Sequence, residues 1–467
     1  MYTVSVTAKK ILQRFPRIKR RAAQLLSLMP LSARLGRNFW TWYAFYEESE
    51  CWSQEQMAAY QISTLQHLLT ELKGSSPYYR DLLLGVDPAS IDSVQRFQQF
   101  VPTQTQTDFS SQFERIVAQN LDRRVEHSST SGTTGKAMQF YHPYRDGERE
   151  WASVCHQWKR VGYIPGQSRR VEFRGLLSKG SLVEEFPHRN MIRCSILHLG
   201  HEHIRVYAEV IRRNKINFIH GYPSAVALLA DGIKTSGINF PQPEAILLAS
   251  EMVLDWQQQR IRAAFPEARI FAHYGCAQRT VIAGWCEYRQ EYHVLPLYGL
   301  TEVDPETGEL IATNLHNTVN GFVRFRMGDA ALEWSAEPCP DCGRPYLLRI
   351  KELAGRLEDY LYAPERGWIP SAIMTFPLKS LRAVGEIQFV QKEQDEIVIR
   401  YILKSQSQEA EAAAELQIAV EKFQEMFGRE MNLSLQRVDS FERGATGKWK
   451  WIVSELDRWN YLRERRE

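Results

Sequence analysis

A short segment rich in hydroxyl groups and glycines, ending in a lysine, is the part of this sequence best suited to chemistry. It runs from residue 128 to 136 and reads Ser-Ser-Thr-Ser-Gly-Thr-Thr-Gly-Lys. Hydroxyls, backbone amides at glycines and one lysine can together donate many hydrogen bonds to phosphate oxygens. The spacing differs from a Walker A loop, which has four residues between its first glycine and the Gly-Lys pair. The segment therefore predicts a different phosphate-binding loop, with a simple surface turn as the alternative.

A second group of residues has types and spacing that suit zinc. Cys339 and Cys342 form a Cys-x-x-Cys pair, and Cys286 and His293 are the natural further ligands, about fifty residues earlier. A closed tetrahedral site of this kind leaves no position for water, so we expect a structural zinc ion rather than a catalytic one. The alternative is two buried free thiols beside an unrelated histidine.

The remaining cysteines and a histidine cluster predict no further metal site. Cysteines 51, 155, 194 and 276 stand singly, and we expect reduced thiols that are mostly small buried side chains. Histidines 198, 201 and 203 lack a clear fourth ligand, so we expect them to lie in a loop or to cap the helix that follows.

The elements that must position these residues alternate in the middle of the chain. The pattern predicts strands over 217–220, 245–249 and 268–273, with helices over 223–234 and 255–264 between them. This rhythm is typical of an α/β fold with a mostly parallel, doubly wound sheet. In such sheets ligands bind beyond the carboxyl ends of the strands.

The last hundred or so residues predict a separate α+β unit. Strands are expected near 385–390, 396–402 and 433, and a long helix over 409–426. We therefore expect three parts: a basic helical region at 1–83, a large core at 84–357 and a small C-terminal domain at 358–467.

Composition excludes several classes of protein. The 467 residues are 44% hydrophobic and 24% charged, which is typical of a soluble globular protein. No run approaches the roughly 18 apolar residues of a membrane-spanning helix. A net charge of +3 is too small for general nucleic-acid binding.

The charge is unevenly distributed along the chain. Nine basic residues and no acidic ones precede Glu47, and apolar residues recur there at helical spacing. This segment could lie on an anionic membrane surface, pack on the main domain, or be a transit peptide. It lacks the long apolar centre of a secretory signal, so we expect a cytoplasmic protein, with peripheral membrane contact as an alternative.

The phosphate-binding segment resembles the signature of adenylate-forming enzymes, the superfamily of acyl-CoA synthetases, luciferases and nonribosomal adenylation domains. Other segments resemble the same family in the same order along residues 85–455. The resemblance implies a large multi-layered N-terminal domain, a small mobile C-terminal lid, and binding of ATP and Mg²⁺. It assigns the nucleotide to Ser128, Ser129, Thr130, Ser131, Gly132, Thr133, Thr134, Gly135, Lys136, Ser250, Glu251, Tyr274, Gly275 and Asp329.

The resemblance gives particular roles to several of these residues. Ser250 and Glu251 resemble the segment beside adenine, the turn from Tyr274 resembles the one on which adenine stacks, and Asp329 would bind the ribose hydroxyls. An acyl pocket bordered by His220, Gly221, Tyr222 and Pro223 is also implied.

Two further residues would act when the lid closes. Residues 355–359 resemble the hinge, in which Arg356 would bind phosphate or bridge the domains. Residues 444–448 resemble the segment that carries the catalytic lysine, here Lys448. A lysine has a compact charge on a flexible stem, so Lys448 could reach the charge that develops at the α-phosphate.

The closest resemblance is to CapK-type proteins of the phenylacetate:CoA ligase branch, associated with capsule and exopolysaccharide biosynthesis. It is carried by Cys286-Glu287, Tyr292-His293, residues 298–302 and residues 339–344. It implies activation of a small carboxylate and transfer to a small acceptor, an amine or hydroxyl of a sugar or similar molecule. Transfer to coenzyme A and a non-catalytic nucleotide-binding scaffold at the membrane are the alternatives.

One position departs from the family pattern. The turn that begins at Tyr274 normally carries a glutamate for Mg²⁺ four residues later, where this chain has Gln278. Glutamine offers a neutral oxygen and binds a hard cation less strongly than a carboxylate. Glu302 closes a second Tyr-Gly-Leu-Thr-Glu turn, but we assign Gln278 because Tyr274 directly follows a predicted strand. Substitution by another carboxylate or impaired adenylation remains an alternative.

Overall fold

The computed structural model describes eleven segments of the chain and five further single residues. These are residues 29–119, 124–129, 138–174, 181–196, 198–253, 255–346, 348–356, 360–370, 383–403, 409–442 and 452–456, with 177, 374, 377, 378 and 381. The chain divides into two compact units, one within Met1–Thr130 and Gln139–Ala354 and the other within Ser131–Met138 and Gly355–Glu467. The basic segment before residue 29, in which a membrane-contacting helix is predicted, lies outside the described residues.

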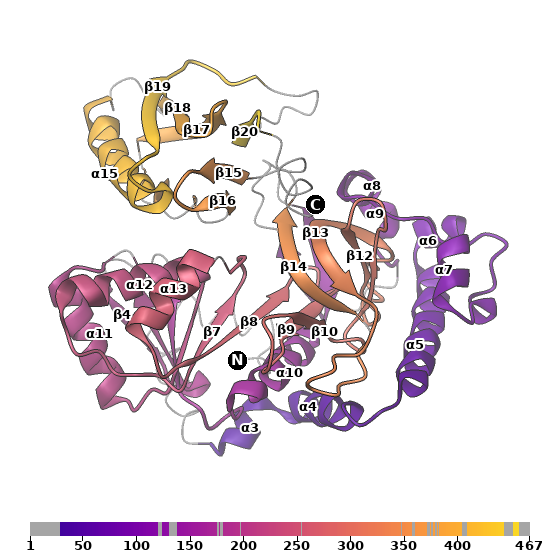
Figure 1. Cartoon of the computed structure of the whole chain (residues 1–467). Helices are drawn as coiled ribbons and strands as arrows, with labels where there is room; N and C mark the ends of the chain where they lie inside the picture. Colours follow the sequence, from indigo (N-terminus) through magenta and orange to yellow (C-terminus); the bar gives the residue numbers. More distant parts are fainter. Residues whose placement is uncertain are drawn as a thin grey trace. The chain divides into compact units, whose positions relative to one another are not determined.

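A twelve-stranded mixed sheet forms the centre of the first unit (Figure 1). Its spatial order is β11 (Leu300–Val303), β12 (Glu309–Thr313), β13 (Phe325–Ser335), β14 (Arg349–Arg356), β10 (Tyr292–Val294), β9 (Ile282–Trp285), β8 (Arg269–Gly275), β7 (Ala245–Ala249), β6 (Phe218–Gly221), β3 (Arg170–Arg174), β5 (Met191–Ser195) and β4 (Val183–Phe186). Strands β5, β3, β6, β7 and β8 are parallel to one another. The strand β7 reads Ala-Ile-Leu-Leu-Ala and is buried throughout, as is typical of a parallel strand covered on both faces.

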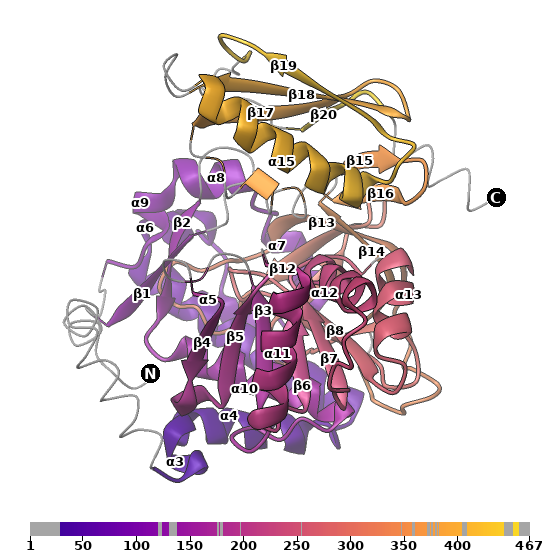
Figure 2. The same cartoon turned by 90° about the vertical axis from the view of Figure 1, so that its left-hand side faces the viewer.

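Four helices follow or precede the parallel strands. They are α10 (Asp146–Trp158), α11 (His201–Arg213), α12 (Pro223–Ser236) and α13 (Asp255–Ala264). Helix α12 contacts both α11 and α13, and Figure 2 shows these three helices side by side over the sheet. Helix α10 packs instead against β8 and β9. This architecture confirms the predicted α/β fold class.

Further helices and a hairpin complete the first unit. The helices are α3 (Leu31–Leu35), α4 (Arg37–Ser49), α5 (Gln54–Ser75), α6 (Pro77–Leu82), α7 (Val94–Phe100), α8 (Gln106–Ser111) and α9 (Phe113–Ile116). Helix α5 begins at a capping box, in which Ser53 accepts from the backbone of Gln56 and Gln56 accepts from that of Ser53. Strands β1 (Val125–Ser129) and β2 (Gln139–Pro143) pair as an antiparallel hairpin.

The second unit is a small α+β domain. A four-stranded sheet has the order β19 (Asn432–Arg437), β18 (Glu396–Leu403), β17 (Val384–Gln391) and β20 (Ile452–Ser454). A separate hairpin pairs β15 (Tyr360–Ala363) with β16 (Gly367–Pro370). Helix α15 (Glu409–Phe427) buries Phe423 against Phe389 of the sheet, with ring centroids 5.0 Å apart. The predicted separate α+β unit is confirmed.

The observed elements match most of the predicted ranges, with two corrections. The predicted strand at 245–249 and helix at 255–264 are observed at those residues. Strand β8, however, extends through Gly275, so the turn begins at Cys276 and not at Tyr274. Cys155 and Cys194 are buried as expected, whereas Cys51 is exposed and Cys276 is partly exposed because it opens this turn. None of the described helices combines the length and hydropathy needed to cross a membrane.

Candidate functional site

Two of the predicted nucleotide-binding residues meet at the end of strand β8. The Tyr274 hydroxyl donates a hydrogen bond of 2.7 Å to Asp329 Oδ2. Tyr274 is the penultimate residue of β8, and Asp329 lies on β13, 55 positions later in the chain. The sheet therefore brings together the aromatic ring and the carboxylate to which the family resemblance assigns adenine and ribose.

The turn after β8 is held in place by contacts with three other segments. His142 Nε2 lies 2.9 Å from the Ala277 carbonyl oxygen, and Asn314 Nδ2 donates to the Gln278 carbonyl at 3.0 Å. Gly299 lies so close beneath the turn that an added Cβ would come within 1.9 Å of the Thr280 carbonyl oxygen. Only glycine allows this close approach. These contacts fix the backbone of the turn.

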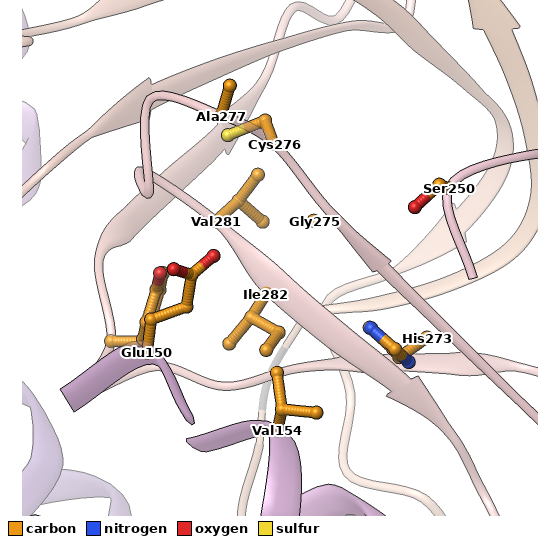
Figure 3. A pocket seen from close by; sticks show the side chains of 10 residues that line it. Glu150, Val154, Ser250, His273, Gly275, Cys276, Ala277, Val281 and Ile282 are labelled. Atoms are coloured by element: carbon orange, nitrogen blue, oxygen red, sulfur yellow. The ribbon is translucent and has the colours of Figure 1, made fainter. Parts of the chain in front are cut away.

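A cavity of about 240 Å³ opens beside this turn. Its walls come from the ends of β7 and β8, the turn, β9 and one face of helix α10 (Figure 3). The residues that line it are Glu150, Val154, Ser250, His273, Gly275, Cys276, Ala277, Val281, Ile282 and Tyr298. It lies at the carboxyl ends of parallel strands, where α/β sheets bind their ligands.

Ser250 enters the cavity from a left-handed backbone conformation. It follows β7 directly and has φ of 68°, which is uncommon for a residue other than glycine. Figure 3 shows its hydroxyl directed toward the space between β8 and the loop that carries Ser250. The neighbouring Glu251 is partly exposed. Both predicted adenine-side residues therefore lie at the end of β7, next to the strand that carries Tyr274.

A buried network of charges underlies the cavity. Asp146 on α10 accepts from Arg149 Nε at 2.8 Å and from Arg279 Nη1 at 3.0 Å. Burial alone would raise the pKa of Asp146, but the two guanidinium groups outweigh it and hold that pKa well below its usual range. Arg279 Nε also donates to Glu150 Oε2 at 2.7 Å, and Glu126 lies 3.8 Å from Arg279 Nη2.

The histidines around the cavity are held in their neutral forms. Burial, reinforced by His220, lowers the pKa of His273 to about 3. Burial, reinforced by Arg279, lowers that of His142 to about 4. Trp158 Nε1 donates to His273 Nδ1 at 3.3 Å, so the proton of the neutral ring resides on Nε2. His273 can therefore offer the cavity a hydrogen-bond donor without a charge.

The predicted acyl-pocket segment lies one strand further from the turn. His220 and Gly221 end β6, Tyr222 caps α12, and Pro223 is the first residue of that helix. The His220 ring lies 6.4 Å from that of His273, nearly parallel to it, and His220 Nδ1 lies 3.3 Å from Glu172 Oε1. His273 lines the cavity, so His220 lies next to a residue of its wall.

The two candidates for the magnesium position differ clearly in their surroundings. Gln278 is buried within the turn after β8. Glu302 lies on the edge strand β11, where Arg324 donates to both of its carboxylate oxygens at 3.0 Å. Gln98 donates a further hydrogen bond to Glu302 at 2.7 Å. Glu302 therefore has a structural partner set of its own, formed by Arg324 and Gln98.

The four predicted zinc ligands converge on one point. Cys286 follows β9, His293 is the central residue of β10, and Cys339 and Cys342 lie in the connection between β13 and β14. Their candidate ligand atoms all lie within 4.8 Å of one another, and Cys342 Sγ is 3.7 Å from His293 Nδ1. Zinc bonds of roughly 2.0–2.3 Å at tetrahedral angles place neighbouring ligand atoms about 3.5–3.8 Å apart, so the arrangement fits this metal.

The surroundings of this cluster support metal binding. Burial, reinforced by Arg160, lowers the pKa of His293 to about 3, so the ring is neutral, as a ligand must be. Arg344 donates twice to Glu287 at 2.8 Å, which joins the connection before β14 to the hairpin of β9 and β10. An ion pair between Arg289 and Asp341 joins the same two segments. Ion pairs therefore join the two segments that carry the four ligands.

Other predicted residues lie partly or wholly outside the described chain. Ser128 and Ser129 end β1, opposite Phe140 and Gln139 of β2, so the phosphate segment begins in this hairpin. Residues 130–137 and Lys448 lie outside the described residues. Arg356 is the last residue of β14, and only its backbone is among the described parts of the chain.

Sequence reasoning missed the contribution of helix α10 and of the asparagines near β12. Glu150 and Val154 line the cavity from one face of α10, and Arg279 ties Glu150 to the turn. The i, i+4 spacing of Asp146 and Glu150, interrupted by Arg149, was the available signal, because charged residues at core spacing need partners. Asn314, Asn317 and Asn320 recur at three-residue steps; Asn314 bonds to the turn, and Asn317 and Asn320 bond to the backbone of Tyr141 on β2.

Comparisons with known proteins agree with this architecture. Residues 361–455 match the family described as CapK C-terminal domain. A search of curated proteins gave no match. The fold is similar to that of 2-hydroxyisobutyryl-CoA ligase in the postadenylation state in complex with R3-HIB-AMP, with 19% identity, a TM-score of 0.52, and coverage of 88% of this chain and 92% of that one. The same values hold for that enzyme in complex with 2-HIB-AMP and CoA in the thioesterification state. The fold of an adenylate-forming ligase is thereby confirmed, and residues 361–455 confirm the resemblance to CapK-type proteins for the C-terminal domain.

Proposed function

We propose that this chain, which has the fold of an adenylate-forming ligase, activates a carboxylate with ATP and releases pyrophosphate. The observation that carries the proposal is the Tyr274–Asp329 pair at the end of β8, beside the cavity of about 240 Å³. An aromatic ring and a carboxylate suit adenine and ribose, and the adjoining cavity suits a small acid. The solved relative supports this reading, because it was crystallised with an acyl-adenylate, 2-HIB-AMP.

The chemistry explains the residue types in the site. A carboxylate is a poor electrophile because oxide is a poor leaving group, so the acid is joined to the α-phosphate to form an acyl-adenylate. The main requirement is stabilisation of charge at phosphorus. Residues 128–136 would bind phosphate oxygens and Lys448 would approach the α-phosphate. Bound Mg²⁺ would neutralise phosphate charge, with the Gln278 amide oxygen assisting water and phosphate ligands.

For the second step we propose transfer of the acyl group to a small acceptor in polysaccharide or related metabolite biosynthesis. The CapK C-terminal domain match at 361–455 supports this. Transfer to coenzyme A is the second candidate, and it is favoured by the presence of CoA in a crystal of the solved relative. A non-catalytic nucleotide-binding scaffold would require that no acid be activated.

We further propose a structural Zn²⁺ held by Cys286, His293, Cys339 and Cys342. Four protein ligands complete a tetrahedron, so the ion would stabilise the fold and take no part in the reaction. We also retain the division into 1–83, 84–357 and 358–467, with the last part as a mobile lid hinged near Arg356. The protein is proposed to work in the cytoplasm, with membrane contact confined to its basic N-terminal region.

The test is pyrophosphate release from ATP and Mg²⁺ with a panel of carboxylic acids. We expect release that depends on one class of acid and falls up to about tenfold in Asp329→Asn, because the ribose loses an ionised acceptor. Glu302→Gln is the matched control, since it neutralises a carboxylate on the edge strand β11. Adding coenzyme A and then amino sugars would identify the acceptor. Absence of release with every acid would favour the scaffold.

A further inference from the structure

One wall of the cavity carries a carboxylate that the adenylation reaction does not require. Glu150 projects from α10 into the cavity, and Figure 3 shows its carboxylate directed toward the interior, facing Ile282 and Val281. The side chain is 36% exposed, and it lines the cavity. Val154, four residues later on the same face of α10, provides an apolar surface beside it. The cavity thus combines aliphatic walls with one acidic group.

The charge of Glu150 is only partly balanced. Arg279 donates to Glu150 Oε2 at 2.7 Å, but it also pairs with Asp146 at 3.0 Å and lies 3.8 Å from Glu126. Arg149 is the other guanidinium group in this cluster and pairs with Asp146. Among the described residues of this cluster, three carboxylates therefore share two guanidinium groups, and the neutral His142 adds no charge. Burial raises the pKa of Glu150, which indicates that its charge is incompletely solvated.

The hydrogen bonding of Glu150 leaves one of its oxygens available to a ligand. Among the described residues, Arg279 alone donates a hydrogen bond to this carboxylate, and it does so at Oε2. An ionised carboxylate can accept about four hydrogen bonds. A ligand that covered Oε1 with an alkyl group would desolvate it without compensation, at a cost in affinity.

We propose that the acid activated by this protein is a short carboxylic acid whose tail carries a hydrogen-bond donor, a hydroxyl or an ammonium group, that binds Glu150. The proposal rests on the proposed adenylation function and specifies its substrate class. The reacting carboxylate would lie near the turn at Cys276 and Ala277, the alkyl chain would pack against Val154 and Ile282, and the donor would reach Glu150. Glu150 is then a specificity-determining residue.

The test compares acids that differ only in the terminal group. Pyrophosphate release is measured with butyrate, 4-hydroxybutyrate and 4-aminobutyrate, and with the matching three-, five- and six-carbon sets. We expect kcat/KM at least tenfold higher for a donor-bearing acid than for its apolar counterpart, because rejection follows from leaving a polar group unpaired. Equal or better use of the apolar acid at every chain length would overturn the proposal.

Variants of Glu150 separate charge from shape. Glu150→Gln keeps an acceptor oxygen and removes the charge. Its kcat/KM should therefore stay unchanged for a hydroxy acid and fall at least tenfold for an amino acid. Glu150→Leu should abolish the preference for donors and improve use of the apolar acid. Glu126→Gln is the matched control, because it removes a carboxylate near Arg279 that does not line the cavity. If Glu126→Gln abolished the preference as Glu150→Leu does, the preference would not come from Glu150 and the proposal would fail.

Binding measurements distinguish this proposal from the adenylation function itself. If no acid releases pyrophosphate, the proposed function fails, and the same acids are then tested by thermal shift of the intact protein. Stabilisation by donor-bearing acids that exceeds that by their apolar counterparts, and that is lost in Glu150→Leu, would still support a binding site for this class. The proposal would be overturned if only the apolar acids stabilised the protein, if both kinds of acid stabilised it equally, or if no acid stabilised it.

Discussion

Replacing one zinc ligand by serine tests the metal cluster most directly. Cys339→Ser keeps the size of a buried side chain but removes a thiolate that zinc requires. We expect the wild-type protein to carry about one zinc ion per chain and the variant to carry much less. The variant should also unfold at a lower temperature, because the cluster joins the hairpin of β9 and β10 to the connection between β13 and β14.

The size of the effect follows from the chain that the metal closes. Cys286 and Cys342 enclose roughly 55 residues, and a covalent link across such a loop stabilises a protein by about 4 kcal/mol through the entropy of the unfolded chain. Zinc that also binds the unfolded chain reduces this value, so about 4 kcal/mol is an upper figure. In a domain of this size we expect the melting temperature to fall by about 5–10 °C.

The assay is metal analysis together with thermal unfolding, before and after treatment with a zinc chelator. Cys194→Ser is the matched control, because Cys194 is equally buried on β5 and lies outside the cluster. Cys194→Ser should lower the free energy of unfolding by only about 1–3 kcal/mol, because it buries a hydroxyl group. Without zinc, wild type should resemble Cys339→Ser in stability. Zinc-free protein from a chelator-free purification, or equal melting of Cys339→Ser and Cys194→Ser, would refute the reasoning.

Three further predictions concern the reaction and the stability of the fold. Lys448→Ala should lower the rate of pyrophosphate release by about a hundredfold or more with little change in ATP affinity, because its charge acts on the transition state; unchanged release would remove it from the mechanism. Gln278→Glu should lower the magnesium concentration at half-maximal release, whereas Glu302→Gln should lower thermal stability and leave that midpoint unchanged; the opposite pattern would place the metal at Glu302. Burial holds the pKa values of His142 and His273 at about 4 and about 3, so the unfolded chain binds protons below pH 6.5 that the native protein excludes. Stability should be complete above pH 6.5 and fall toward pH 4, with a smaller slope in His142→Gln; a denaturation midpoint that is constant over this range would contradict the assignment.

The fold could be predicted where short segments carry a strong local pattern. Strand β7 is uniformly apolar because it is buried on both faces, and helix α13 follows from its own periodicity. The end of β8 could not be predicted, because Tyr274 and Gly275 continue the strand only through their pairing with β9. This pairing extends β8 by two residues beyond the apolar run, and local propensity does not report such an extension.

The candidate site divides in the same way. The zinc cluster was predictable because the spacing of Cys339 and Cys342 is itself a signal. Glu150 was not, because its importance depends on where α10 packs and on Arg279, which lies 129 positions later in the chain. Residues that support a site through tertiary packing give only a weak signal in a single sequence, such as charged residues at core spacing on a helix.

The hydrogen bond between Tyr274 and Asp329 has a consequence for discrimination between nucleotide sugars. If a ribose hydroxyl takes the place of the Tyr274 hydroxyl at Asp329 Oδ2, one hydrogen bond is exchanged for another. The net gain from such an exchange is about 0.5–1.5 kcal/mol, well below the value of a new charge-assisted bond. A nucleotide that lacks one ribose hydroxyl would leave Tyr274 in place rather than a bare carboxylate. Selection of ATP over its deoxy form should therefore be modest, about two- to tenfold, and should increase in Tyr274→Phe, which removes the competing hydroxyl.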